Sequence, residues 1–314
     1  MLSFKSVQYV SPRPGPRLLV LGTVHGNEVC GGIAIRRLID ALDRGEMALD
    51  CGTLTLVPIS NPLAFQKGER NGDRNLNRRL MPTATPVEFE DQVANWLCPL
   101  LSEHEVLLDL HSFQGGGPGF VMVGPRDNTG AIEPFVHEAK EQAFARALGV
   151  GRGVWGWLST YAAGVERRAA AGVTGGDLSV DYGVGTTEYM RRQGGWGVTL
   201  ECGQHQALEA PEVAYRAILN ALAHLGMLRD APPPPQASMD GLQIFDVVDR
   251  ASEGDTFARA WRSFDPVAKG EVIGTRADGV VLRATEDVVL LFPNDRAPVG
   301  QEWFYLARPS GRFR

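Results

Sequence analysis

The stretch that decides the fold is RLLVLG at residues 17–22, followed directly by TVHGNE at residues 23–28. The apolar run predicts a buried strand, and apolar residues at helical spacing from about Asn27 to Leu42 predict a helix after it. This alternation continues, with strands predicted at residues 53–59, 106–110, 120–123 and 198–200 and helices at residues 87–101, 134–148 and 211–228. We therefore expect an α/β fold with a mostly parallel or mixed central sheet flanked by helices.

A proline run then divides the chain. Residues 229–240 read RDAPPPPQASMD, and four consecutive prolines favour an extended spacer because they suit neither a helix nor a central strand. Beyond it, short β-rich runs are separated by Gly, Asp and Pro, which is typical of a small all-β unit. We expect an α/β domain at residues 1–228, a Pro-rich linker at residues 229–240 and a β-rich C-terminal domain at residues 241–314.

Composition excludes several classes of function. The 314 residues include 31 Lys and Arg against 37 Asp and Glu, a net charge of −6, which argues against a general nucleic-acid binder or a membrane-surface protein. No apolar stretch approaches the roughly 18 residues of a spanning helix, and the N-terminus has no signal-type apolar core. The four cysteines form no CxxC pair, as is typical of reduced thiols in the cytoplasm. We expect a cytoplasmic protein that binds neither nucleic acid nor membrane.

Metal-ligating side chains follow two of the predicted strands. His25 and Glu28 follow the first strand, and His111 ends the strand that contains Asp109. In open α/β sheets these strand ends meet at one edge, so the three ligand types can converge. Two imidazoles and one carboxylate leave a position for water, the layout of a catalytic Zn²⁺ site, although Co²⁺, Mn²⁺ or Ni²⁺ also suit such ligands. Asp109 could orient a ligand from behind or cap a nearby turn, and each histidine motif alone is more typical of a structural role.

A carboxylate closes a third apolar strand. Glu201 ends the run at residues 196–200, and a charge there is costly unless it is paired or functional. Beside a metal-bound water it would act as general base, whereas the alternative is a salt-bridged Glu at the rim of the sheet. His205 follows a few residues later, and we interpret it as structural rather than as a ligand.

The loop after the second strand is rich in arginine and asparagine. Residues 67–79 read KGERNGDRNLNRR, with five basic side chains against two acidic ones. Arginine binds carboxylates in bidentate fashion and can polarise a carbonyl oxygen such as a scissile one. A cationic loop in an acidic protein suggests a small anionic substrate rather than a polyanion.

Four motifs in this order resemble the succinylglutamate desuccinylase/aspartoacylase family, part of the wider zinc-carboxypeptidase clan. They are HGNE at 25–28, RNGDRNLNR at 70–78, DLH at 109–111 and LECG at 200–203. The resemblance covers residues 17–228, and more loosely the QEWFY stretch at 301–305. It implies a zinc-carboxypeptidase-like fold whose C-terminal β domain packs over the mouth of the active site.

The resemblance also implies a zinc-dependent amidohydrolase that releases an amino acid from a small anionic N-acylated form. One Zn²⁺ per chain would be held by His25, Glu28 and His111, with Glu201 as the general base. Arg70 would polarise the scissile carbonyl. The substrate-binding residues would be Asn77 and Arg78 for the carboxylate, with Arg191 or Arg192 near the spacing of a further substrate-binding arginine.

Two segments depart from the family pattern. SFQGGGP at residues 112–118 differs from the aspartoacylases and desuccinylases, and residues 151–197 have no clear counterpart. The acyl group, the amino acid and the formation of a homo-oligomer therefore stay open. A metallocarboxypeptidase acting on short peptides is the alternative enzyme, and a metal-binding relative without turnover is the alternative outside catalysis.

Overall fold

The computed structural model describes residues 2–170, 179–228 and 238–313. Most of the predicted linker, residues 229–237, lies outside the described residues. The helices are α1 (Cys30–Asp43), α2 (Pro62–Lys67), α3 (Phe89–Glu103), α4 (Glu138–Ala147), α5 (Trp157–Ala170), α6 (Thr186–Arg192) and α7 (Ala210–His224), with short 3₁₀ turns at Val180–Gly183 and Gly311–Phe313. The strands up to α7 are β1 (Val7–Val10), β2 (Arg17–Gly22), β3 (Thr53–Val57), β4 (Val106–Phe113), β5 (Phe120–Met122), β6 (Arg152–Trp155) and β7 (Trp196–Gln204). After α7 come β8 (Asp240–Asp249), β9 (Thr256–Phe257), β10 (Asp265–Val267), β11 (Val272–Thr275), β12 (Val281–Arg283), β13 (Val288–Leu291) and β14 (Glu302–Ser310).

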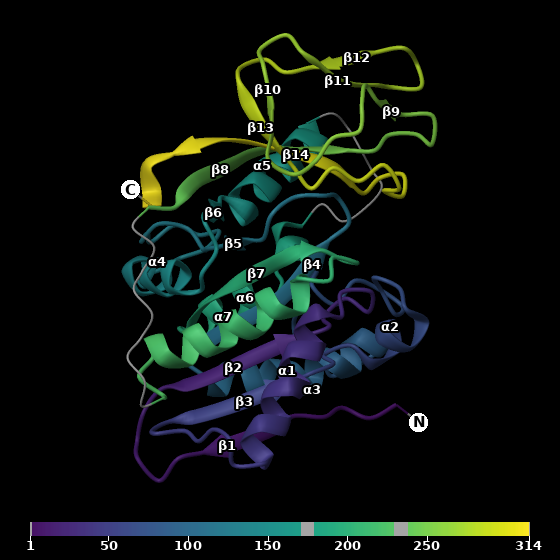
Figure 1. Cartoon of the computed structure of the whole chain (residues 1–314). Coiled ribbons are helices and arrows are strands. Elements are labelled where there is room, and N and C mark those ends of the chain that lie inside the picture. The colour runs from purple at the N-terminus through teal and green to yellow at the C-terminus, as the bar shows by residue number, and fades with distance from the viewer. Residues whose placement is uncertain (1, 171–178, 229–237, 314) are drawn as a thin grey trace.

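One large sheet runs through the molecule in the order β1-β3-β2-β4-β7-β5-β6-β8-β14-β13-β10 (Figure 1). Strands β3, β2, β4 and β7 are parallel to one another, while β5 runs antiparallel to β7. The carboxyl ends of β2, β4 and β7 therefore lie at the same edge of the sheet. That edge is where the sequence places the candidate site.

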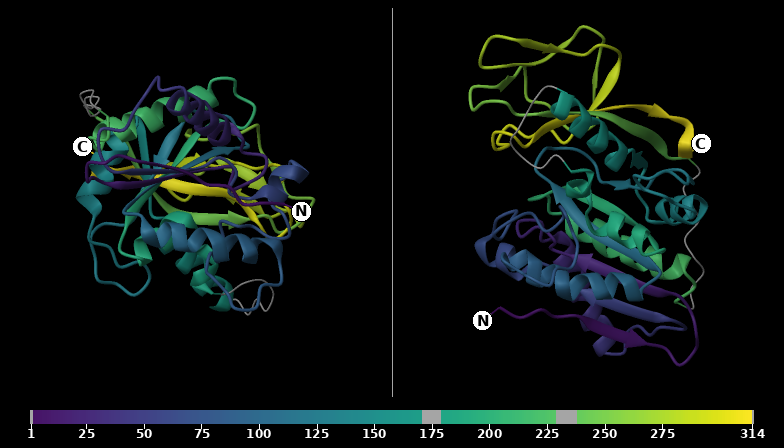
Figure 2. Two further views of the ribbon diagram at one scale, coloured as in Figure 1. Left: turned by 90° about the horizontal axis from the view of Figure 1, so that it is seen from below. Right: turned by 180° about the vertical axis from the view of Figure 1, so that it is seen from behind.

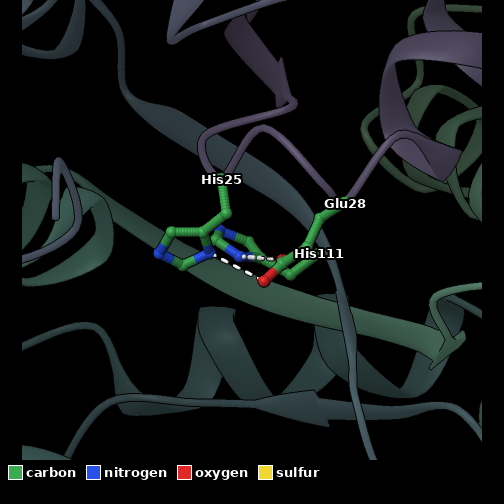
Figure 3. Close-up of side chains that lie close together, drawn as sticks. All are labelled: His25, Glu28 and His111. Carbon is green, nitrogen blue, oxygen red and sulfur yellow. Dashed lines mark hydrogen bonds and ion pairs between the residues drawn. The ribbon is translucent and has the colours of Figure 1, made fainter. Parts of the chain in front are cut away.

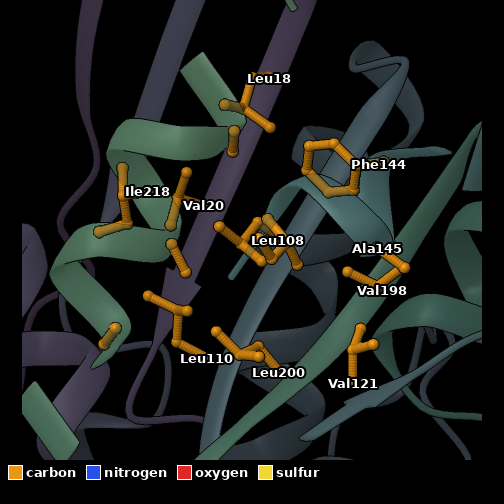
Figure 4. Packing of buried hydrophobic residues seen from close by; sticks show 14 of the residues in the cluster. Leu18, Val20, Leu108, Leu110, Val121, Phe144, Ala145, Val198, Leu200 and Ile218 are labelled. Atoms are coloured by element: carbon orange, nitrogen blue, oxygen red, sulfur yellow. The ribbon is translucent and has the colours of Figure 1, made fainter. Parts of the chain in front are cut away.

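Helices cover both faces of the parallel strands (Figure 2). On one face, α1, α4 and α7 enclose a core that includes Val20, Leu108 and Leu200, each 0% exposed (Figure 4). On the other face, α3 and α6 pack over Leu21 and Leu107. Because both faces are buried, these strands read as continuous apolar runs, which is why the sequence reveals them. None of the helices in the described ranges is long and apolar enough to cross a membrane.

The predicted α/β architecture is confirmed, with differences at particular elements. The helix expected from Asn27 begins at Cys30, because the backbone turns at the HGNE motif, where the Glu28 N–H donates to the His25 carbonyl at 3.1 Å. The sequence analysis missed β1, β6, α2, α5 and α6. Strands β1 and β6 have four residues each, too few for a clear pattern, and α6 has seven.

The C-terminal strands are joined to the central sheet. β8 pairs in parallel with β6, and β14, β13 and β10 extend the same sheet by antiparallel pairing. Strands β9, β11 and β12 form a separate three-stranded sheet around Trp303 and Ile273. The described residues after 237 are thus β-rich, as predicted, but hydrogen bonding continues across the predicted domain boundary. The domain limits themselves stay a prediction.

Candidate metal centre and active site

The HGNE motif lies in the loop between β2 and α1. A Cβ at Gly26 would lie 2.0 Å from the backbone of Ala64, so only glycine lets this loop approach α2 so closely. Thr23, directly after β2, has a positive φ of 52°, which turns the chain out of the strand. This tight exit places His25 and Glu28 at the edge where β4 and β7 end.

The parallel register of β4 and β7 positions the other two functional side chains. His111 on β4 lies opposite Glu201 on β7, and Asp109 lies opposite Thr199 two residues earlier. Side chains two residues apart on a strand point to the same face. All four therefore lie on the face covered by α3 and α6, and the loop brings His25 and Glu28 to them.

The three predicted metal ligands come together (Figure 3). His25 Nδ1 lies 2.8 Å from Glu28 Oε1, and His111 Nδ1 lies 2.9 Å from Glu28 Oε2. One potential ligand atom from each residue lies within 4.8 Å of the others, and all three residues are buried. This is the convergence that the strand-end argument predicts.

The outer nitrogens of both imidazoles are held from behind. His25 Nε2 lies 3.0 Å from Asn75 Oδ1, and His111 Nε2 lies 2.8 Å from Asp109 Oδ2. Both oxygens accept hydrogen bonds, which keeps each Nε2 protonated and turns each Nδ1 toward Glu28. His25 Nδ1 makes no well-directed hydrogen bond to the described residues. Two imidazole nitrogens and a carboxylate that face one point are a donor set that fits a divalent metal ion.

The pKa values of Glu28, His111 and His25 are shifted in ways that fit a site for a cation. Burial favours neutral groups, but the two histidines outweigh it at Glu28 and hold its pKa well below the usual range. Burial also opposes protonation of His111, yet Asp109 and Glu28 raise its pKa well above the usual value. Burial and the nearby Arg70 charge lower the pKa of His25 to about 4. The centre thus contains a carboxylate and one neutral imidazole, which a bound cation would stabilise.

Glu201 is buried beside the centre. Its Oε2 atom has no hydrogen-bond partner among the described residues. Burial and the negative charge of Glu28 raise the pKa of Glu201 to about 8. The alternative of a salt-bridged Glu at the rim finds no support, since no ion pair is seen for Glu201 in the described part of the chain. A buried carboxylate that readily takes up a proton is suited to general-base chemistry.

The arginine loop contributes to the same site. Arg70 Nη1 donates to Glu28 Oε1 at 2.8 Å, with the Arg70 side chain 46% exposed. Asn77 Oδ1 accepts the N–H of Thr186 at the start of α6, 2.9 Å away. Arg78 donates to Glu302 on β14 at 2.8 Å and lies 4.7 Å from the centre of the Trp157 ring. Arg78 therefore already has one carboxylate partner, supplied by the C-terminal strands.

Arg191 is placed differently from the expectation for a substrate-binding residue. Its buried guanidinium donates to Glu141 and Glu133 at 2.9 Å, to Glu188 at 3.4 Å and to the Gly197 carbonyl at 2.9 Å. The side chain borders the cavity, but these contacts engage all of its nitrogens. Its neighbour on α6, Arg192, pairs with Asp181. We leave both arginines out of the proposed substrate site.

A cavity of about 410 Å³ surrounds the candidate centre, within the range of small-molecule sites. Its lining includes the predicted residues His25, Glu28, Arg70, Asn77, Arg78, His111, Arg191 and Glu201. The sequence analysis gave no site role to the lining residues Arg296, Glu302 and Tyr305. His205, interpreted there as structural, and Trp157, in the divergent segment 151–197, line the cavity as well. The QEWFY stretch, which contains Glu302 and Tyr305, was the available signal. The C-terminal strands thus contribute one wall of the cavity.

Comparisons with known proteins agree with these features. Residues 14–116 match the succinylglutamate desuccinylase/aspartoacylase catalytic domain. No match was found among curated protein sequences. The structure is similar to a succinylglutamate desuccinylase/aspartoacylase from Rhodobacter sphaeroides, at 19% identity over 98% of this chain and 90% of that chain, with a TM-score of 0.73.

Two further solved structures show the same fold. One is the product-bound ectoine utilization protein EutE (DoeB) from Ruegeria pomeroyi, at 20% identity over 96% of this chain and 88% of that one, with a TM-score of 0.70. The other is an aspartoacylase family protein from Mesorhizobium loti, at 22% identity over 99% of this chain and 90% of that one, with a TM-score of 0.66. The match at residues 14–116 and this shared fold confirm the resemblance of the chain to the succinylglutamate desuccinylase/aspartoacylase family.

Proposed function

We propose that this protein is a zinc-dependent hydrolase that cleaves the amide bond of a small N-acylated amino acid. The observation that supports this most strongly is the arrangement of His25, Glu28 and His111, whose inward atoms lie within 4.8 Å of one another. The acid Glu201 lies on the strand next to His111. Neither imidazole can turn its Nδ1 away without losing the partner of its Nε2, so the arrangement is preorganised for an ion.

The chemistry divides between the ion and the chain. When bound, a Zn²⁺ ion lowers the pKa of a coordinated water and polarises the scissile carbonyl. Glu201 takes a proton from the attacking water and returns it to the nitrogen of the departing amino acid. The raised pKa of Glu201, about 8 without a metal, favours proton uptake. Arg70 offsets the negative charge that develops on the carbonyl oxygen.

The substrate is held by the loop that ends at Arg78. Asn77 and Arg78 lie beside Thr186 and Trp157, and we propose that they bind the carboxylate of the amino-acid half. Glu302 neutralises part of the Arg78 charge and fixes its position. A substrate carboxylate would then meet a guanidinium that is already oriented, which lowers the entropic cost of binding.

The cavity favours a small substrate over a peptide. Residues of the C-terminal segment, including Pro293, Arg296 and Pro298, line it together with the arginine loop. A carboxypeptidase needs an open cleft for the peptide chain on the N-terminal side of the scissile bond, whereas this wall narrows a cavity of about 410 Å³. The metallocarboxypeptidase alternative therefore ranks second.

The proposal is tested by a hydrolysis screen over N-formyl, N-acetyl and N-succinyl amino acids, read as free amine released by zinc-loaded protein. We expect turnover of at least one of these classes and loss of it on chelation. Turnover of short peptides alone would reverse the ranking of the two enzymes, and turnover of neither would contradict the proposal.

Two variants separate the roles of the residues. Glu201→Gln should abolish turnover while zinc stays bound, because the amide cannot accept the proton. His111→Ala should lower the zinc content instead. Near-full activity of Glu201→Gln would remove Glu201 as the base, and full zinc occupancy in His111→Ala would remove His111 from the ligands.

A further inference from the structure

A serine–histidine pair lies in the same cavity and has no part in the chemistry above. Ser112 Oγ and His205 Nδ1 are 2.8 Å apart, and both residues line the cavity. The contact joins the end of β4 to the residue after β7. A second bond fixes the backbone, because the His205 N–H donates to the Phe113 carbonyl at 3.0 Å. His205 is therefore held in one position at the cavity wall.

The chain reaches this position through a turn that depends on glycine. Gly203 has a φ of 130°, a conformation that residues with a side chain rarely adopt. The ladder between β4 and β7 shifts register at this point, so that Phe113 lies opposite Gln204. This irregularity directs the residue after the strand back toward the cavity. Bulges next to active sites commonly redirect a side chain in this way.

The strand register shows which half of the substrate His205 would face. The candidate ligand His111 and the base Glu201 lie at one level of the sheet. Asp109 lies two residues earlier, and its contact with Thr186 puts Thr186 and Asn77 on that inner side. His205 follows Gln204, and its N–H donates to the Phe113 carbonyl two residues beyond His111, which puts His205 on the outer side. If Asn77 and Arg78 hold the amino acid, the acyl group extends toward His205.

The hydrogen-bonding state of His205 suits contact with a neutral polar group. Burial lowers the pKa of His205, which keeps its ring neutral near pH 7. Nδ1 is engaged by Ser112, so Nε2 is the nitrogen left to bond a ligand. A fixed polar atom in a cavity wall disfavours a ligand that presents only hydrocarbon to it, because that atom then loses its hydrogen bond to water.

We propose that His205 contacts the acyl half of the substrate through Nε2, and that the preferred acyl group carries a hydroxyl or similar hydrogen-bonding oxygen beyond the scissile carbonyl. This rests on the proposed function, and it makes His205 a specificity-determining residue. The sequence analysis interpreted His205 as structural, and this holds for Nδ1, which bonds Ser112. Nε2 has the separate role of selecting the substrate. Ser112 acts as the positioning residue that orients the ring.

The test uses acyl groups matched in shape. The ratio of kcat/KM is measured for N-glycoloyl against N-propanoyl, and for N-(3-hydroxypropanoyl) against N-butanoyl, on one amino acid. Each pair exchanges a hydroxyl for a methyl group of similar size. We expect the zinc-loaded full chain to prefer the hydroxyacyl member of at least one pair by about fivefold or more, the scale of one neutral hydrogen bond.

Two amide variants separate the nitrogens of His205. His205→Asn retains a polar atom near Nδ1, so it keeps the Ser112 contact and loses the Nε2 contact, and it should reduce the preference to within about twofold. His205→Gln retains a polar atom near Nε2 and should keep most of the preference. A partly unfolded variant lowers both rates together, so the ratio isolates recognition from stability.

Each outcome decides between the proposals. A ratio near one in the wild-type chain, or an equal preference in wild type and His205→Asn, overturns the inference while turnover itself still supports the proposed function. Retention of the preference in His205→Asn with loss in His205→Gln would assign selectivity to the Nδ1 side and likewise overturns it. No hydrolysis of any N-acyl amino acid overturns the proposed function and this inference with it.

Discussion

At the scale of single residues, the candidate centre is defined by the partners behind its ligands. His111 is held by Asp109 at 2.8 Å and His25 by Asn75 at 3.0 Å, so both rings are oriented before any ion arrives. Such outer partners fix the tautomer and raise the basicity of the ligand. The affinity for metal should therefore depend on residues that never touch the ion.

Asp109→Asn tests that dependence. The amide keeps the size of the side chain but removes the charge that raises the proton affinity of His111, so we expect the zinc affinity to fall by about 10- to 100-fold. The measurement is competition with a chromophoric chelator. The matched control is Asp181→Asn, since Asp181 pairs with Arg192 away from the centre. Equal zinc affinities for Asp109→Asn and wild type would show that Asp109 does not tune the site.

The raised pKa of Glu201 predicts a pH dependence of stability in the metal-free protein. Its pKa is about 8 in the folded chain and about 4.3 in an unfolded one, so between these values the folded state binds the extra proton. The contribution of Glu201 to the free energy of unfolding is thus largest below about pH 4, and it is lost as the pH rises toward 8. In the apoprotein, Glu201→Gln should raise Tm by a few degrees at pH 7.5.

The same variant supplies its own control at lower pH. At pH 5.5 most of the folded wild-type chain already carries the proton, so the gain in Tm should be much smaller than at pH 7.5. Thermal unfolding of chelator-treated protein at both pH values measures the difference. An equal gain at both values would mean that the carboxylate is not the source of the effect, and no gain would mean that its pKa is not raised.

At the scale of secondary-structure elements, α6 is fixed to the sheet by one buried arginine. Arg191 bonds Glu141 on α4, Glu188 on its own helix and the Gly197 carbonyl on β7. These contacts join two helices and a strand under the inner side of the cavity. Burial and the other carboxylates around Arg191 also raise the pKa of Glu133 to about 7, because the carboxylates outnumber the guanidinium.

Replacing Arg191 by leucine should therefore strongly reduce the stability of the folded chain. Removing one partner of a buried ion pair leaves uncompensated carboxylates, and the typical cost is about 3–5 kcal/mol. Arg192→Leu is the matched control, because Arg192 is on the same helix with an exposed partner, and the expected cost is within about 1 kcal/mol. Urea unfolding measures both. Similar costs for the two variants would contradict the role given to Arg191.

The elements also show where sequence reasoning succeeds and where it fails. His25, Glu28, His111 and Glu201 were predictable because each follows a buried apolar strand, and parallel strands end at one edge. The contacts of Glu133 and Glu302 were not predictable, because they join residues distant in sequence. For Arg191 the family resemblance implies a substrate contact, whereas its hydrogen bond to Glu141, 50 residues away in the sequence, could not be foreseen.

At the scale of the whole molecule, one sheet connects the site to the C-terminal strands. β6 and β8 are paired in parallel, and Arg78 is bonded to Glu302 on β14. The Arg78 charge holds the pKa of Glu302 at about 2 in spite of its burial, so this ion pair persists at neutral pH. The wall that narrows the cavity is therefore part of the same sheet as the candidate metal centre.

A chain shortened to residues 1–228 tests this continuity. It would expose the edge of β6 and leave Arg78 without its carboxylate partner, so we expect aggregation or a Tm several degrees lower than that of the full chain. Size-exclusion chromatography and thermal unfolding provide the measurement. A monomeric fragment with the full chain's Tm would show that residues 1–228 fold independently of the β-rich segment, as the proline run suggests.

The most direct test is a zinc titration of the chelator-treated full chain, followed as release of free amine from an N-acyl amino acid. We predict that activity rises linearly with added Zn²⁺, levels off at one ion per chain, and stays absent in His111→Ala over the same range. Hydrolysis that is independent of added metal, or equal in the His111→Ala chain, would contradict the shared ion of His25, Glu28 and His111.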